Sequence, residues 1–252
     1  MEEGKFRRFF ESSLVGDEKE VTLRGSEVHH MKNVLKVSEG DSVSLFNGKG
    51  VELIGTVKEI GRDNVHITID KKLEPRAESR VDVTLLQGFV RGEKNELIIQ
   101  KATELGVKKI KFYASPWTKI KVKEDDRGKK EDKLFKVAVD AAKQCERSFV
   151  PEIKVYSSME EAIDSSSEGF KIIFYEEERA KSLRKVLSNT DDIDSGVAVL
   201  IGPEGGFSSE EVIYAKSKGF ISAGLGLRTL RSETAAISAV TILQYEFGYM
   251  GG

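Results

Sequence analysis

The chain reads Val-Ala-Val-Leu-Ile at residues 197–201 and Gly-Pro-Glu-Gly-Gly-Phe at residues 202–207. An apolar, β-branched run that stops at glycines and precedes a helical pattern is typical of a buried parallel strand whose carboxyl end opens into a loop. Such loops are where open α/β sheets bind ligands. Glycines let the backbone approach a ligand closely and leave its N–H and C=O groups free to bind it. This stretch therefore predicts an α/β domain with a ligand site at the loop.

A second loop of the same kind follows in the chain. Residues 223–227 read Ala-Gly-Leu-Gly-Leu, and residues 228–234 read Arg-Thr-Leu-Arg-Ser-Glu-Thr. One such loop alone is equally well explained as a tight turn in which glycine supplies a positive φ. Two of them close together favour a site where backbone groups bind a small polar cofactor.

Neither loop fits the common nucleotide-binding fingerprints. A Walker loop places a lysine directly after its last glycine, and both loops lack that lysine. The dinucleotide fingerprint Gly-x-Gly-x-x-Gly belongs after the first strand of its domain, whereas Gly224-Leu225-Gly226 comes near the end of the chain. With Glu204 in the first loop, the sequence favours a cofactor with a sugar and a base over one with several phosphates.

Composition narrows the class of protein. The chain has 252 residues, of which 39% are hydrophobic, and this is enough for a substantial core. A net charge of −2 argues against a protein that coats DNA without sequence preference. The single cysteine excludes an internal disulfide, and three histidines argue against a histidine-based metal site. Because neither a signal peptide nor a run of about 18 apolar residues is evident, we expect a soluble, cytoplasmic protein without metal or membrane contact.

The first part of the chain predicts a small domain of strands. Strands are expected at residues 5–10, 43–46, 51–60 and 65–69, and one helix at residues 26–36 with Ser26 as its N-cap. Residues 1–73 therefore predict a small β-barrel with one helix. The polar residues 74–80, which include a proline, predict a linker.

Residues 81–252 predict a second, α/β domain. Strands are expected at residues 81–89, 110–113, 153–156 and 172–175, before the two loops described above, and helices at residues 93–105, 130–145, 180–187 and 231–245. This alternation predicts a mostly parallel sheet with helices on both faces.

The two loops also resemble the signature segments of a known family. Residues 200–208 (Leu-Ile-Gly-Pro-Glu-Gly-Gly-Phe-Ser) and 225–236 (Leu-Gly-Leu-Arg-Thr-Leu-Arg-Ser-Glu-Thr-Ala-Ala) closely resemble those of the RsmE family, and the likeness extends to residues 7–10, 29–35, 100–107 and 141–147. Members of this family are SPOUT-type methyltransferases. They use S-adenosylmethionine to methylate the N3 nitrogen of one uridine in 16S ribosomal RNA.

The resemblance implies a fold, a cofactor and partners. It implies a SPOUT α/β domain with a deep trefoil knot at residues 81–252, one of the rare exceptions to unknotted topology, and a PUA-like RNA-binding β-barrel at residues 1–73. It also implies a homodimer that acts on 16S ribosomal RNA, within the 30S subunit. The residues that would surround S-adenosylmethionine are Leu200, Ile201, Gly202, Glu204, Gly205, Gly206, Leu225, Gly226 and Leu230.

Methylation at N3 of uracil requires the loss of a proton. Either a base removes it or nearby cations stabilise the deprotonated ring. Arg228 and Arg231 flank the second loop and would hold a phosphate or the developing anion, since a guanidinium group stays charged. Glu233 is the candidate base. An alternative is that Ser232 and Glu233 merely cap the last helix and complement its dipole.

RNA contacts require local positive charge. The candidates are Arg7, Arg8, Lys101, Gln144, Arg147 and Arg228. The lysines around Trp117 form a further basic stretch that would hold phosphates and stack a base, or that is an ordinary solvated face. Two other functions remain open: a SPOUT enzyme that methylates ribose 2′-hydroxyls, and a non-catalytic RNA-binding or ribosome-assembly protein.

Overall fold

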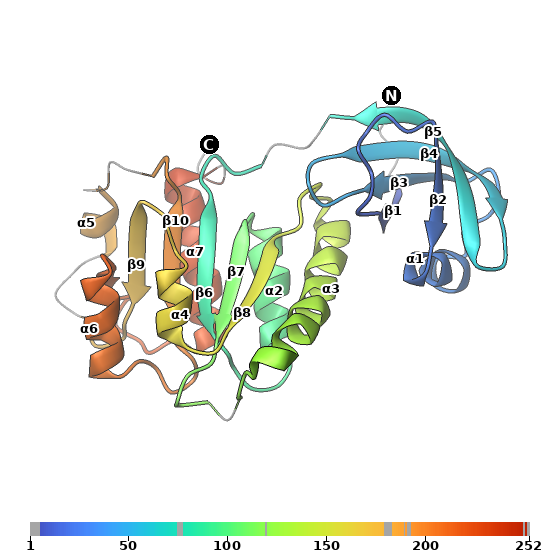
Figure 1. Cartoon of the computed structure of the whole chain (residues 1–252). Helices are drawn as coiled ribbons and strands as arrows, with labels where there is room; N and C mark the ends of the chain where they lie inside the picture. Colours follow the sequence, from blue (N-terminus) through green and yellow to red (C-terminus); the bar gives the residue numbers. More distant parts are fainter. Residues whose placement is uncertain are drawn as a thin grey trace. The chain divides into compact units, whose positions relative to one another are not determined.

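The computed structural model describes residues 6–74, 78–118, 120–178, 183–188, 190, 193–248 and 250 (Figure 1). The chain divides into two compact units, one of residues 1–77 and 142–150 and the other of residues 78–141 and 151–252. The sequence analysis assigned residues 142–150 to the second domain. They group with the first unit because its backbone binds them: Gly50 N donates to Ser148 O at 3.1 Å, and Val150 N donates to Gly48 O at 3.0 Å.

The first unit contains a five-stranded sheet in the order β1-β3-β4-β5-β2. Its strands are β1 (Arg7–Phe10), β2 (Glu20–Arg24), β3 (Ser42–Phe46), β4 (Glu52–Ile60) and β5 (Asn64–Leu73). β1 pairs with β3 in parallel, and the other neighbours pair antiparallel. β2 was not predicted, and β5 extends four residues beyond the end of the predicted strand at residues 65–69.

Alternating side chains build the core of this unit. Along β5, Val65 and Ile67 are buried, whereas His66 and Thr68 are not, as expected for a strand with one buried face. The buried side chains of Val65 and Ile67 pack in one cluster with Phe9, Leu45 and Met31.

The helix of the first unit begins differently from the prediction. It consists of α1 (Ser26–His29), which continues as a π-helical turn over His30–Val34. The N-cap is Gly25, with φ 70° and ψ −140°, and no side chain caps the helix. The predicted Ser26 cap was wrong, because the chain enters the helix through a backbone conformation that glycine adopts readily.

The second unit contains a six-stranded sheet in the order β11-β9-β10-β6-β7-β8, and all its neighbours pair in parallel. Its strands are β6 (Val83–Gly88), β7 (Lys109–Tyr113), β8 (Glu152–Tyr156), β9 (Phe170–Phe174), β10 (Val197–Ile201) and β11 (Ile221–Ala223). β10 has the bounds that the sequence predicted. β11 ends where the predicted apolar run of the second loop begins.

Helices cover both faces of this sheet (Figure 1). α2 (Lys94–Glu104) and α7 (Ser232–Phe247) pack together, and α7 also contacts β6 and β10. α4 (Met159–Asp164) and α6 (Ser209–Ser217) pack on the alternate side chains Leu86, Ala198 and Leu200. The remaining helices are α3 (Arg127–Cys145), a 3₁₀ turn before it (Glu124–Asp126), and α5 (Leu183–Ser188).

Three predicted elements lie partly outside the described residues. The residues concerned are 5 of the expected strand at 5–10, 75–77 of the expected linker, and 180–182 of the expected helix at 180–187. Among the helices that the structure does describe, none combines the length and the apolar character that crossing a membrane requires.

The strand order defines a crevice in the second sheet. β6 and β10 are neighbours, but the chain leaves β6 for β7 on one side and leaves β10 for β11 on the other. Ligands of open α/β sheets bind at the carboxyl ends of strands where the order reverses in this way. In this unit that edge carries the loop after β10.

Candidate functional site

A cleft of about 470 Å³ lies at the carboxyl end of β10. Its lining combines both loops that the sequence singled out, the start of α7 and one residue of α2. The lining residues are Lys94, Phe174, Glu176, Ile201, Gly202, Pro203, Glu204, Gly206, Phe207, Thr229, Leu230, Arg231, Ser232 and Ala235. A smaller hollow of about 80 Å³ shares five of these residues and adds Tyr175, Leu225, Gly226, Leu227 and Arg228.

The structure brings together seven of the nine predicted cofactor residues. Leu200 and Gly205 do not line the cleft or the hollow. Leu200 is fully buried on the α4 and α6 face of the sheet. Gly205 faces Trp117, since a Cβ atom on Gly205 would lie 3.0 Å from Trp117 Cβ. Leu200 and Gly205 therefore face away from the cleft and offer no side chain to a ligand there.

Buried side chains hold the backbone of the first loop. Tyr113 Oη donates to Ile201 O at 2.8 Å, and Ser232 Oγ donates to Gly202 O at 2.6 Å. Gln87 Nε2 donates to Ser232 Oγ at 2.9 Å. Because a carbonyl can only accept, the Ser232 proton points to Gly202, and Gln87 must supply the N–H to Ser232. This chain of hydrogen bonds ties β6, the loop and α7 together.

Ser232 therefore does not cap α7. The N-cap residue is Arg231, and no side chain caps the helix there. The alternative interpretation of Ser232 as a capping residue was wrong, because its hydroxyl is committed to the carbonyl of Gly202.

Glu204 is paired. Lys94 Nζ donates to Glu204 Oε1 at 2.7 Å, and Arg91 N donates to Glu204 Oε2 at 3.4 Å. The hydrogen bond from Lys94 holds the pKa of Glu204 below its usual value, and the same bond raises the pKa of Lys94. Both groups are charged at neutral pH.

Glu233 lies in the first turn of α7 and is 9% exposed. Its Oε1 lies 3.7 Å from Lys94 Nζ, whereas its Oε2 has no hydrogen-bond partner among the described residues. Arg231, two residues earlier, lines the cleft, whereas Glu233 does not. Of the two candidate catalytic residues, only Arg231 lies in the cleft. Glu233 lies next to it through Lys94, a lining residue that no pattern in the sequence marked.

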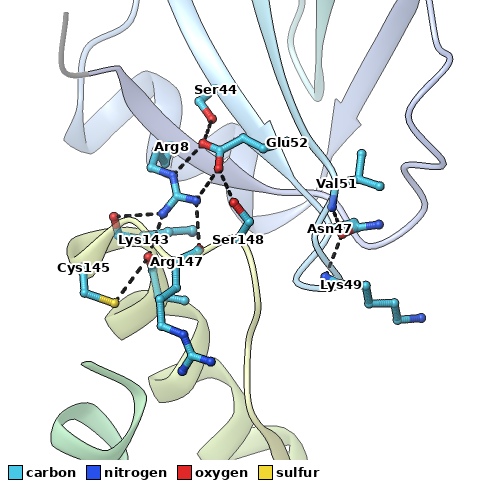
Figure 2. A network of polar contacts seen from close by, with 11 residues as sticks. Arg8, Ser44, Asn47, Lys49, Val51, Glu52, Lys143, Cys145, Arg147 and Ser148 are labelled. Atoms are coloured by element: carbon cyan, nitrogen blue, oxygen red, sulfur yellow. Dashed lines mark hydrogen bonds and ion pairs between the residues drawn. The ribbon is translucent and has the colours of Figure 1, made fainter. Parts of the chain in front are cut away.

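Arg8 is not available for RNA (Figure 2). Its Nε and Nη2 donate to the two oxygens of Glu52 at 3.0 and 2.9 Å, and the side chains are 6% and 8% exposed. Its Nη1 donates to Ala142 O at 2.7 Å, and its Nη2 to Arg147 O at 2.9 Å. The prediction of an RNA contact at Arg8 was wrong, because all three guanidinium nitrogens donate to acceptors inside the first unit. The guanidinium carbon also lies 4.4 Å from the Phe46 ring centroid.

Glu52 accepts four hydrogen bonds in this cluster (Figure 2). Besides Arg8, the hydroxyls of Ser44 and Ser148 donate to it. Burial opposes its ionisation, but the hydrogen bonds from Arg8, Ser148 and Ser44 outweigh this effect and hold the pKa of Glu52 below its usual value. The cluster joins β1, β3, β4 and residues 142–148 within the first unit.

The other predicted RNA residues lie at the surface or close to it. Arg7 pairs with Asp41 at 3.1 Å, and Lys101 pairs with Glu104 at 2.8 Å. Gln144 and Arg228 are exposed, and Arg147 is half-buried. Only Arg228 of this group borders the cleft region.

The basic stretch around Trp117 borders a larger hollow of about 860 Å³. Lys121 and Lys123 line it, but so do Glu160, Glu210 and Glu211. Lys119 lies outside the described residues. Because lysines and glutamates line this hollow together, its charge does not indicate a binding site for a phosphate backbone.

Two family models match most of the chain. The family described as RNA methyltransferase domain matches residues 77–244, and the family described as RNA methyltransferase PUA domain matches residues 23–70. The fold and the site therefore define an RNA methyltransferase with an amino-terminal PUA domain.

Relatives narrow the family. Ribosomal RNA small subunit methyltransferase E of Bacillus subtilis is 28% identical over 92% of both chains, and that of Buchnera aphidicola (subsp. Schizaphis graminum) is 32% identical over 90% of this chain and 91% of its own. The chain belongs to the ribosomal RNA small subunit methyltransferase E (RsmE) family.

Solved structures share the whole fold. A methyltransferase of Legionella pneumophila in complex with S-adenosylmethionine superposes with a TM-score of 0.88 at 29% identity, covering 96% of this chain and 98% of that one. The Neisseria gonorrhoeae ribosomal RNA small subunit methyltransferase E bound to S-adenosylmethionine gives a TM-score of 0.86 at 26% identity, with the same coverage.

Proposed function

We propose that this protein methylates the N3 nitrogen of one uridine in 16S ribosomal RNA. The chain is an S-adenosylmethionine-dependent ribosomal RNA methyltransferase of the RsmE family. One observation supports the finer assignment: Arg231 and Lys94 line the cleft that both glycine loops border, and the Glu233 carboxylate lies 3.7 Å from Lys94. An N–H that must lose its proton before methylation needs such a combination of cations and a carboxylate.

The cleft suits S-adenosylmethionine in size and chemistry. Its volume of about 470 Å³ lies within the common range for ligand pockets of about 300–1,000 Å³. Phe174, Ile201 and Leu230 supply apolar walls, and Glu176 and Glu204 supply carboxylates for hydroxyl or ammonium groups. When bound, S-adenosylmethionine supplies an electrophilic methyl group on a sulfonium. The proposed contacts come from Ile201, Gly202, Glu204, Gly206, Leu225, Gly226 and Leu230, with Leu200 and Gly205 supporting the loop.

Gly206 supports this assignment. Its φ is 70°, and a Cβ atom at this position would lie 2.9 Å from Glu176 Oε1. A side chain here would be strained and would crowd the carboxylate, so the loop requires glycine to bring its backbone to the cleft.

The residues of α7 account for the chemistry. Arg231 lines the cleft and would stabilise the negative charge that develops on the uracil oxygens. Glu233, with one oxygen unpartnered, would accept the N3 proton. An in-line approach of the uracil nitrogen to the methyl group would supply much of the rate.

The family also informs the proposed assembly. We expect the loops after β10 and β11 to form the trefoil knot of SPOUT enzymes, and two chains to form a homodimer. The PUA domain would bind the RNA through Arg7, and Gln144 and Arg147 of the same unit are further candidate contacts. Lys101 and Arg228 are the remaining candidates in the second unit. The net charge of −2 suits a substrate presented by the assembled 30S subunit, where contacts other than phosphates contribute.

Nucleoside analysis tests the proposed function. Purified protein is incubated with S-adenosylmethionine and either 30S subunits or naked 16S ribosomal RNA from cells that lack the enzyme, and the nucleosides are measured by mass spectrometry. We expect 3-methyluridine, formed faster on 30S subunits. Formation of a 2′-O-methylated nucleoside would support a ribose methyltransferase instead, and equal rates on both substrates would contradict the role of the subunit.

A further inference from the structure

Lys94 lies between the loop after β10 and the start of α7. It lies in the first turn of α2, directly after the loop that leaves β6. Its Nζ is 2.7 Å from Glu204 Oε1 in the cofactor loop and 3.7 Å from Glu233 Oε1 at the start of α7. It lines the cleft and its side chain is 35% exposed. An ammonium group therefore stands at the junction between the cofactor loop and the candidate base.

The charges around Glu233 match one edge of uracil. On the Watson–Crick edge of uracil, the N3–H donor is flanked by two carbonyl acceptors, O2 and O4. Glu233 is an acceptor, the donor Lys94 lies 3.7 Å from it, and the donor Arg231 lines the same cleft as Lys94. Arg231 is close enough to Lys94 for its charge to oppose that of the lysine. Proteins read unstacked bases through hydrogen bonds on this edge, and cytosine, with an unprotonated N3 and an amino group, presents a different pattern.

We propose that Lys94 is a further catalytic and specificity-determining residue of the methylation reaction, one that donates to a uracil carbonyl oxygen next to N3. This inference rests on the proposed function. As the N3–H bond breaks, the proton passes to the Glu233 carboxylate, and the negative charge spreads onto the oxygen that Lys94 holds. The N3 electron pair then forms the bond to the methyl carbon, and the electron pair of the carbon–sulfur bond stays on sulfur.

A matched pair of lysines separates this role from a surface ion pair. Lys218 pairs with Asp164 at 2.7 Å, the same distance as Lys94 and Glu204, and its side chain is 42% exposed. Lys218 does not line the cleft. Lys94→Met and Lys218→Met thus remove comparable ion pairs from the same unit, and only the first removes a cation from the cleft.

The test measures kcat and KM on 30S subunits and the Kd of S-adenosylmethionine by calorimetry. Because removing one preorganised donor from a developing anion typically costs about 10²–10³-fold in rate, we expect Lys94→Met to lower kcat by that factor. We expect the cofactor Kd to change less than about threefold, Lys94→Arg to keep more activity than Lys94→Met, and Lys218→Met to match the wild type.

A substrate with 5-fluorouridine at the target supplies a readout that a structural role would not move. Its N3–H is more acidic, so it should restore part of the rate lost in Lys94→Met. The proposal is overturned if Lys94→Met keeps the wild-type kcat, if its loss of activity is matched by weaker cofactor binding, or if 5-fluorouridine gives no rescue. Failure of the proposed function is distinguishable, because wild-type protein would then form no 3-methyluridine.

Discussion

Replacing Arg8 by alanine removes the centre of the buried cluster in the first unit. The Glu52 carboxylate, 8% exposed, would keep only the hydroxyls of Ser44 and Ser148 as donors. The carbonyls of Ala142 and Arg147 would lose the donor that Arg8 supplies. Because breaking a buried ion pair by removing one partner typically costs about 3–5 kcal/mol, we expect Arg8→Ala to lower the free energy of unfolding of this unit by that amount.

The neighbouring residue provides the control. Arg7 also forms an ion pair, with Asp41 at 3.1 Å, but the two side chains are 47% and 40% exposed. Exposed pairs contribute about 0.2–1 kcal/mol, so Arg7→Ala should have a small effect. Replacing both partners of the buried pair, Arg8→Met with Glu52→Leu, should be less destabilising than Arg8→Met alone, because no charge is then left unpaired.

Hydrogen exchange of β3 and β4 amides is the suitable assay. The only tryptophan of the chain, Trp117, belongs to the second unit, so its fluorescence does not report on the first. The free energy of opening is measured for each variant from exchange of these amides in urea. If Arg8→Ala and Arg7→Ala change it equally, by less than about 1 kcal/mol, the cluster does not stabilise the first unit as we infer.

Three further outcomes are expected. Since the pKa of Glu52 is lowered on folding, the first unit should lose stability as the pH falls below the ordinary value of 4.5, and Glu52→Gln should flatten this dependence in acid unfolding curves. Ser232→Ala should weaken S-adenosylmethionine binding about two- to thirteenfold in calorimetry, because a net hydrogen bond is worth about 0.5–1.5 kcal/mol, and an unchanged Kd would contradict its role. Gly88→Ala should disrupt cofactor binding, because its Cβ would lie 2.6 Å from Pro203 N, whereas the open helical position Gly128→Ala should raise the thermal midpoint.

Local pattern was sufficient for the central strands and for the loops that form the cleft. The run at residues 197–201 is apolar throughout because β10 is covered on both faces, and its bounds follow directly from the glycine after it. Short elements with mixed polarity gave no such signal. β2 begins at Glu20 and ends at Arg24, and only two of its residues are buried. α4 has six residues and depends on Ser158, whose hydroxyl accepts from Glu161 N.

The misassigned residues depend on partners that are distant in sequence. Arg8 beside two phenylalanines looked like an RNA contact, but its acceptors are Glu52 and carbonyls more than 130 residues away. No pattern in the sequence marked Lys94, because its partners Glu204 and Glu233 are brought to it by the order of strands β6 and β10. Only the strand order, which periodicity does not give, reveals such groups.

The nine residues 142–150 have a consequence for how the protein can be taken apart. Because these residues belong to the first unit, the chain passes between the two units three times, near residues 77, 141 and 150. A fragment cut after residue 77 would lack Ser148 and the hydrogen bond from Val150 N to Gly48 O. The PUA domain therefore cannot be separated by a single cut. To express it alone for RNA-binding studies, or to fuse it to another enzyme, residues 142–150 must be joined to it by a linker.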